Sequence, residues 1–232
     1  MADTKAKIDA KTALYGLLGN PVGHSMSPFM QNQFMEQCDV NGVYLAFDRK
    51  VMRGCRAVKV RASGFSAFES VNAHYSAIVS NMGLVADEHS LSVQNGEPQL
   101  LDGISSDVFL LKLTPGLSPD IFDMLVKLGY RGIVVEAFGL GGINVLHKGL
   151  RGIQRAVEDG ISVVITTQCL YDSANLEVYQ VCTKLLEMGV IQGRDMTSEA
   201  AMTKLMCALG QGMNPEEIAR LFETDLAGEV TL

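Results

Sequence analysis

The sequence lacks any long apolar segment. None of its apolar runs reaches the ~20 residues that a membrane-spanning helix needs. The apolar stretch nearest the start, residues 13–19, is too short and too interrupted to form the core of a secretory signal. We therefore expect a cytoplasmic protein that does not enter a membrane.

Paired cysteines and an excess of positive charge are lacking as well. The five cysteines are odd in number and scattered, and no two of them form a Cys-x-x-Cys pair. This pattern favours a reduced protein over a disulfide scaffold or a zinc module, and we expect no metal site. The net charge of −7 argues against nucleic acid as a partner, because contacts to phosphates need clustered Lys and Arg.

Apolar residues are abundant, at 47% against 19% for charged residues. In a chain of 232 residues this balance is typical of a folded globular protein with a buried core. Residues 107–113, 133–135 and 163–165 are apolar runs with little or no alternation, which is typical of strands buried on both faces of a parallel sheet. Helical patterns at 118–128 and 145–157 separate them, so the sequence predicts an α/β fold.

Each of these three strands is followed by small or polar residues. Right-handed crossovers would bring the three strand ends to one edge of the sheet, where open α/β sheets bind ligands. The candidate binding residues at this edge are Thr114, Glu136, Gly139, Gly141, Gly142, Thr166, Thr167, Gln168 and Cys169.

Two interpretations of the segment from Thr166 to Cys169 stay open. Two hydroxyls, an amide and a thiol can donate and accept hydrogen bonds, which suits a zwitterionic or amide ligand. The same side chains can instead satisfy backbone groups at the end of the strand. Cys169 is not expected to act as a nucleophile, because no histidine or helix N-terminus is evidently placed to lower its pKa.

The glycine-rich turn from Gly139 to Gly142 has the setting of a dinucleotide fingerprint, between a strand and a helix. However, Asn144 occupies the last position of the motif, and the next strand ends without a carboxylate for a ribose hydroxyl. A turn that lets the backbone approach a small ligand, or the helix approach the sheet, fits better. We therefore expect no nucleotide or other cofactor.

The first part of the chain carries the motif Gly-Asn-Pro-x-x-His-Ser-x-Ser-Pro between two predicted strands, at 13–19 and 43–47. Residues 11–47 thereby resemble the opening β-α-β unit of shikimate dehydrogenase. In that family the two serines bind the substrate carboxylate, a role that the resemblance maps to Ser25 and Ser27. From the residues alone, Ser27 is the N-cap of a helix, and both hydroxyls either cap that helix or contact an anion.

A second resemblance covers residues 47–228. It rests on RGCRAVK at 53–59, GFSAFESVN at 64–72, GIVVEAFG at 132–139, TTQC at 166–169, and DMT, EA and TKL between 195 and 205. In order, these resemble the C-terminal part of a type I (cytoplasmic) L-asparaginase. The resemblance implies a three-layer α/β domain with a small parallel sheet, in a homo-oligomer where this domain completes a neighbour's active site.

The family resemblance also implies a binding role for the strand ends. In some members the loop that matches Thr167 to Cys169, and the position of Glu136, belong to an allosteric asparagine site. Those members have an arginine at the position of Glu136. Some members also have, at the position of Gly142, an asparagine that helps the neighbouring site. The implied ligand is a small amino acid, asparagine or aspartate.

The sequence lacks the motifs that perform the chemistry of asparaginases. These are a nucleophilic Thr in Gly-Gly-Thr-Ile, a Thr-Asp pair and a Lys. We therefore assign no catalytic residue and predict an asparaginase-family protein that does not hydrolyse the amide alone. The predicted division is a β-α-β piece at 1–47, a hairpin-rich linker at 48–106 and the asparaginase-like α/β domain at 107–232. The alternatives are a shikimate dehydrogenase-like oxidoreductase fragment, or an oligomerisation module or chimera without a ligand.

Overall fold

A computed structural model describes residues 13–18, 30, 42–47, 50–63, 66–80, 83–87, 100–143, 148–178 and 180–232. The chain divides into two compact units. Met1–Arg53 and Ala57–Leu91 form the first unit, and Gly54–Arg56 and Ser92–Leu232 form the second. The three-part division drawn from the sequence stays a prediction.

The described part of the first unit consists of short strands. They are β1 (Ala13–Leu18), β2 (Gly42–Phe47), β3 (Lys50–Val51), β4 (Ala57–Lys59), β5 (Phe68–Ser70), β6 (Ala77–Ser80) and β7 (Gly83–Ala86). β1 and β2 pair in parallel, as a β-α-β unit requires. The predicted helix between them lies outside the described residues except at Met30, which is helical. Ser25 and Ser27 also lie outside the described residues.

The remaining strands of the first unit pair in antiparallel fashion. β3, β6 and β7 form a three-stranded sheet, and β4 pairs with β5. In the β4–β5 pair, Ala57 lies opposite Ser70 and Lys59 lies opposite Phe68. Just after β4, Arg61 donates to the carbonyl of Ser66 and to the carboxylate of Glu69, both at 2.8 Å.

The second unit is built on a four-stranded parallel sheet. Its strands are β8 (Val108–Lys112), β9 (Gly132–Ala137), β10 (Ser162–Thr167) and β11 (Ile191–Gln192). They lie in the order β11-β10-β9-β8. The three long strands are those that the apolar runs predicted, and their parallel pairing confirms the α/β fold.

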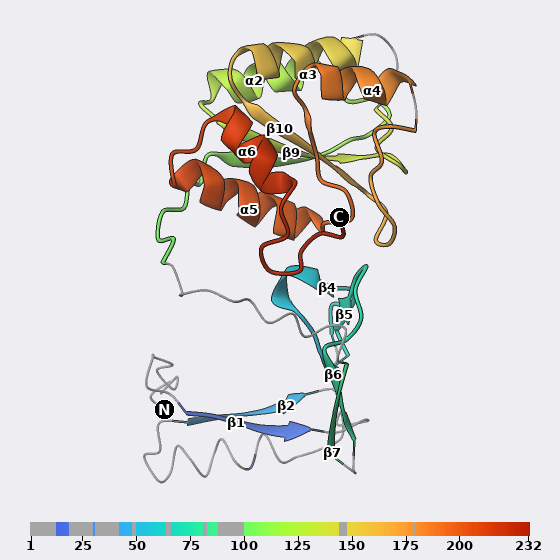
Figure 1. Ribbon diagram of the computed structural model, residues 1–232, viewed down its shortest axis with the longest axis vertical. Helices are drawn as coiled ribbons and strands as arrows, with labels where there is room; N and C mark the ends of the chain where they lie inside the picture. The colour runs from blue at the N-terminus through green and yellow to red at the C-terminus, as the bar shows by residue number, and fades with distance from the viewer. Residues whose placement is uncertain are drawn as a thin grey trace, which may run out of the picture. The chain divides into compact units, whose positions relative to one another are not determined.

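Helices cover both faces of this sheet (Figure 1). They are α2 (Asp120–Lys127), α3 (Lys148–Glu158), α4 (Gln180–Glu187), α5 (Ser198–Gly210) and α6 (Pro215–Phe222). Alternate residues of β9 enter two cores: Ile133 and Val135 pack beneath α2, α3 and α4, whereas Val134 packs against α5 and α6. All three are fully buried, which contributes about 2 kcal/mol each. The unit is therefore a three-layer α/β domain, as predicted.

Local sequence signals set where several helices begin and end. Thr197 caps α5, because its side-chain oxygen accepts from the backbone N–H of Ala200 at 3.1 Å. Asn214 and Glu217 form a reciprocal capping box at the start of α6. Gly189 follows α4 with φ of 90°, a conformation that glycine adopts without strain. None of the helices in the described ranges is long and apolar enough to cross a membrane.

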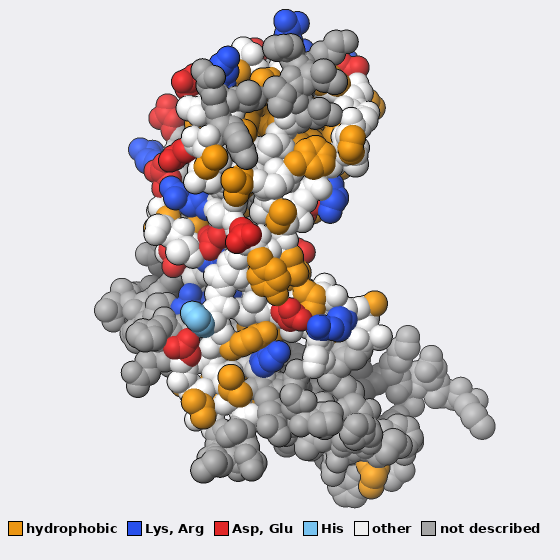
Figure 2. All heavy atoms as spheres, turned by 90° about the vertical axis from the view of Figure 1, so that its right-hand side faces the viewer, with side chains coloured by type: hydrophobic (Ala, Val, Ile, Leu, Met, Phe, Trp, Pro, Cys, Tyr) orange, Lys and Arg blue, Asp and Glu red, His pale blue; other side chains and the backbone are white. Residues whose placement is uncertain are grey.

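Some apolar side chains remain at the surface. On the face drawn in Figure 2, hydrophobic side chains lie among charged ones. Elsewhere on the surface, Met124 and Leu128 of the α2 region are 56% and 70% exposed. Single exposed apolar side chains of this kind are normal for folded proteins and need no functional explanation.

Candidate functional site

The ends of the parallel strands meet at one edge of the sheet. Lys112 at the end of β8 lies opposite Glu136 of β9, and Glu136 lies opposite Thr166 of β10. The register therefore brings together the three strand ends that the sequence placed at a ligand-binding edge. The resulting geometry decides what each candidate side chain contacts.

Thr167 and Gln168 make their hydrogen bonds to the backbone. The Thr167 hydroxyl donates to the carbonyl of Gly139 at 2.5 Å and accepts from the backbone N–H of Cys169 at 3.0 Å. The Gln168 amide donates to the carbonyls of Leu113 at 2.7 Å and Glu136 at 3.0 Å. Both amide hydrogens are thus used, and this side chain joins the ends of β8, β9 and β10.

These bonds bear on the two interpretations of the segment. The contacts of Thr167 and Gln168 are those expected of side chains that hold strand ends together. Thr166 is also fully buried; its hydroxyl lies 3.2 Å from that of Ser198 at the start of α5 and 3.4 Å from the carbonyl of Val135. A ligand that used these groups would compete with bonds already made, so their binding role stays a prediction.

The glycine-rich turn folds back on itself. The backbone N–H groups of Gly141 and Gly142 both donate to the carbonyl of Phe138, at 3.1 and 2.7 Å. They do not point outward as the amides of a phosphate-binding loop would. Gly141 has φ of 108°, and a Cβ there would lie 2.6 Å from the Leu176 side chain. The close approach that Gly141 permits is therefore between the turn and the Leu176 side chain of the same protein.

One positive and one negative side chain face each other at this edge of the sheet. The Lys112 ammonium lies 3.7 Å from the Glu136 carboxylate, with side-chain exposures of 63% and 19%. Thr114 and Cys169 are exposed on the neighbouring strand ends. A solvated ion pair at this distance is weak, so its two partners can exchange for other charged groups.

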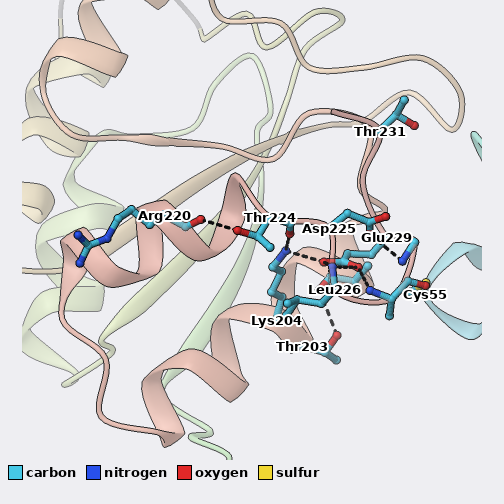
Figure 3. A network of polar contacts seen from close by, with 12 residues as sticks. Cys55, Thr203, Lys204, Arg220, Thr224, Asp225, Leu226, Glu229 and Thr231 are labelled. Carbon is cyan, nitrogen blue, oxygen red and sulfur yellow. Dashed lines mark hydrogen bonds and ion pairs between the residues drawn. The ribbon is translucent and has the colours of Figure 1, made fainter. Parts of the chain in front are cut away.

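The described residues contain a polar cluster that the sequence did not predict. Lys204 of α5 is 7% exposed, and its ammonium donates to the carbonyl of Thr224 at 2.6 Å and to Glu229 at 2.5 Å (Figure 3). Glu229 also accepts from the backbone N–H groups of Leu226 and Ala227. Burial favours a raised pKa for Glu229, but the bonds from Lys204 and from the backbone outweigh it and lower the pKa to about 2.

A second buried ion pair ties down the C-terminal tail. Arg56 is 2% exposed; it donates to Asp195 at 3.0 Å and to the carbonyl of Gly228 at 2.7 Å. Asp195 also accepts from the backbone N–H of Thr231. The Arg56 guanidinium thus bonds to a carboxylate and to carbonyls of segments that lie far from it in the sequence. A pattern within a few residues could not reveal these contacts.

One sequence signal could have located the Lys204 pair. On α5 this lysine is followed by Leu205 and flanked by Ala201 and Ala208, all of which are buried. A lysine among apolar positions of a helix needs a buried partner, because an unpaired buried charge is costly. The acidic tail offered that partner.

Neither a metal site nor a catalytic lysine–hydroxyl pair emerges from the described ranges. They hold no group of three or more His, Cys, Asp or Glu that could bind a metal ion. Lys204, the one lysine buried in the described part of the chain, contacts a carboxylate and a carbonyl rather than a hydroxyl. The geometry therefore supplies no activated side-chain nucleophile around this lysine.

Comparison with protein families finds matches to two parts of the chain. Residues 107–222 match the glutaminase/asparaginase C-terminal domain, which is half of the chain. Residues 17–69 match the shikimate dehydrogenase substrate-binding domain, a weaker similarity. Many of the residues in this second match lie outside the described ranges, so the proposed oxidoreductase alternative stays a prediction.

Individual relatives match over longer stretches. An L-asparaginase from Thermococcus kodakarensis is 39% identical over 190 residues, 82% of this chain and 57% of that protein. A glutamyl-tRNA(Gln) amidotransferase subunit from Methanopyrus kandleri is 40% identical over 190 residues, 78% of this chain and 40% of the relative. The corresponding amidotransferase subunit from Thermofilum pendens is 34% identical over 221 residues, 94% of this chain and 48% of the relative. The chain thus spans roughly half the length of these relatives.

Solved structures share the fold. The thermostable L-asparaginase from Thermococcus kodakarensis superposes with a TM-score of 0.75 at 36% identity, over 88% of this chain and 62% of that one. L-asparaginase I from Vibrio cholerae gives a TM-score of 0.74 at 29% identity, over 88% of this chain and 63% of that one.

Proposed function

Because the chain belongs to the glutaminase/asparaginase family, we propose that it provides the non-hydrolytic C-terminal part of an asparaginase-type protein. On this proposal it does not release ammonia from asparagine by itself. The observation that supports it most directly is that the hydroxyl groups of Thr166 and Thr167, at the end of β10, are already engaged. Thr166 is buried and Thr167 is bonded to the backbone on both sides, so neither is poised to attack an amide.

Amide hydrolysis requires three elements in one place. A nucleophile must be activated by a base, and donors must stabilise the developing oxyanion. The backbone N–H groups of Gly141 and Gly142 are the donors of this turn that resemble those of an oxyanion site. Both are already bonded to the carbonyl of Phe138. The buried ammonium of Lys204 is paired with Glu229. What the domain offers instead is an edge with a weak ion pair, in which Lys112 is exposed and Glu136 is partly buried.

That ion pair suits a small zwitterion. The α-carboxylate and α-ammonium of asparagine or aspartate complement the ammonium of Lys112 and the carboxylate of Glu136. The exposed Thr114 hydroxyl on the adjacent loop can supply a further hydrogen bond. We propose asparagine or aspartate as the ligand of this edge, in a homo-oligomer of the protein.

Two measurements on the purified chain test the proposal. Ammonia release from L-asparagine should remain at the level of a no-protein blank; turnover at enzyme-like rates would overturn the non-hydrolytic assignment. L-Asparagine or L-aspartate should raise the melting temperature, because a ligand that prefers the folded form stabilises it. Glu136→Gln should reduce that shift, whereas Asp123→Asn, at an exposed ion pair between α2 and α3, should leave it unchanged. No shift with either amino acid would favour a ligand-free scaffold.

The amidotransferase relatives support a second candidate. The match to the Thermofilum pendens amidotransferase subunit extends over 94% of this chain, further than the 82% of the asparaginase match. The chain would then serve as part of an amidotransferase subunit and not of a free-standing asparaginase. Copurification with another subunit of a glutamyl-tRNA(Gln) amidotransferase would favour this candidate, and a self-associating protein without such a partner would favour the first.

A further inference from the structure

An apolar cavity lies on the α5–α6 side of the sheet. Its volume is about 250 Å³, and almost all of its lining is apolar. One wall is a stripe of α5 that includes Ala200, Cys207 and Ala208. The rest of the lining comes from Cys55 and Leu101, from the α5–α6 connection at Met213, from α6 and from the C-terminal tail, which includes Leu226. The strand-end edge proposed above as an amino-acid site is formed by different residues.

The polar side chains in this lining are already bonded. Lys204 and Glu229 bond to each other and to the backbone of the tail (Figure 3). The Thr203 hydroxyl donates to carbonyls of its own helix, at 2.9 and 3.1 Å. The Cys55 thiol donates to the carbonyl of Ala227. Because these polar groups are already bonded, the lining favours an apolar occupant over a polar one.

The volume of the cavity and the residues that line it restrict the kind of molecule that fits there. An engineered cavity of ~150 Å³ holds benzene, so 250 Å³ leaves room for a one- or two-ring molecule. Three sulfur-containing residues, Cys55, Cys207 and Met213, line the walls. Sulfur makes favourable contacts with aromatic ring edges. The side chains of Leu101 and Leu226 in the lining are half exposed, which leaves an access path from solvent.

From these observations we infer that this cavity is a binding site for a small uncharged aromatic molecule of one or two rings. The C-terminal tail forms part of its wall and is held in place by the Lys204–Glu229 ion pair. The inference does not depend on the proposed function, because it uses neither the strand-end edge nor any hydrolytic step.

Indole is a suitable probe, because the chain contains no tryptophan and indole emission can be excited apart from that of tyrosine. Titration of the full chain with indole should shift the indole emission saturably, with one site per chain. Cys207→Phe fills the cavity and should weaken binding at least about tenfold. The matched control is Cys169→Phe, because Cys169 is exposed on the β10 loop and does not line the cavity.

A second measurement on the unaltered protein covers the case in which Cys207→Phe fails to fold. Saturating indole should slow alkylation of Cys207 by iodoacetamide and leave that of Cys169 unchanged, as read by peptide mass spectrometry. Non-saturable binding, equal affinity of Cys207→Phe, or absence of Cys207 protection would each overturn the inference. So would a dimer that dissociates when indole is added and reforms when it is removed, since a second copy would then be the natural occupant.

Discussion

Replacing Glu229 by Gln removes the negative partner of a buried ammonium. The side chains of Lys204 and Glu229 are each 5% exposed, so water cannot easily take over the lost interaction. Breaking a buried pair from one side costs about 3–5 kcal/mol. The pKa of Glu229 gives a compatible figure: lowering it from 4.5 to about 2 corresponds to about 3 kcal/mol of stability at neutral pH. We expect Glu229→Gln to destabilise the domain by about 3 kcal/mol.

The pH dependence supplies an independent signature. The folded-state pKa of Glu229 is depressed, so its contribution is present above the unfolded value of 4.5 and is lost as the pH falls toward about 2. The free energy of unfolding of the original protein should therefore fall more steeply over this window than that of Glu229→Gln. Urea titrations followed by circular dichroism at several pH values measure both quantities.

The partner substitution completes the test. Lys204→Met with Glu229→Gln should recover most of the loss, because no unpaired charge then remains buried. Asp123→Asn, at the exposed pair with Arg155, is the matched control and should leave the urea midpoint almost unchanged. A negligible effect of Glu229→Gln, or a double variant no more stable than the single one, would show that the ion pair does not stabilise the folded protein.

Three further substitutions test the site and the fold. Thr167→Val removes two part-buried hydrogen bonds of the side-chain hydroxyl, to the carbonyl of Gly139 and from the N–H of Cys169, and should cost about 1 kcal/mol in urea unfolding. Gly141→Ala places a Cβ 2.6 Å from the Leu176 side chain at a φ of 108° and should cost about 1–3 kcal/mol, read as a lower melting temperature. Asn214→Ala removes the cap that accepts from the N–H of Glu217 and should cost about 1 kcal/mol, with increased amide exchange in the first turn of α6.

Each of these expectations has a clear contrary outcome. A neutral Thr167→Val would mean that the hydroxyl is free for a ligand, which would strengthen the binding interpretation of the strand end. A neutral Gly141→Ala would mean that the turn relaxes away from Leu176. Unchanged exchange in α6 with Asn214→Ala would mean that tertiary packing alone sets where this helix begins.

The architecture of the second unit was largely readable from local patterns. Apolar runs such as Val163 to Ile165 predicted strands buried on both faces, because only covered parallel sheets place every side chain of a strand in a core. The caps at Thr197 and Asn214 are likewise local features, since a helix start depends on bonds within four residues. The gathering of the strand ends followed from the handedness of the connections.

The meeting of the candidate residues at one edge of the sheet was predictable, but their contacts were not. The sequence led to the edge formed by Thr114, Glu136 and the Thr166–Cys169 segment, but it left open whether these side chains face a ligand or the backbone. The bonds from Gln168 to the carbonyls of Leu113 and Glu136 depend on which strands are neighbours and in what register. That information is not contained in any short stretch of the chain.

The sequence by itself thus determined the buried strands of the parallel sheet, the helices between them and the family to which the chain belongs, because each depends on patterns within a few residues or along a matched segment. Only the tertiary structure decided that Arg56 reaches Asp195 and that Lys204 reaches Glu229. Those partners lie 139 and 25 residues apart in the sequence. The physical reason is that a buried charge selects its partner by position in space, and that position exists only once the layers have packed around it.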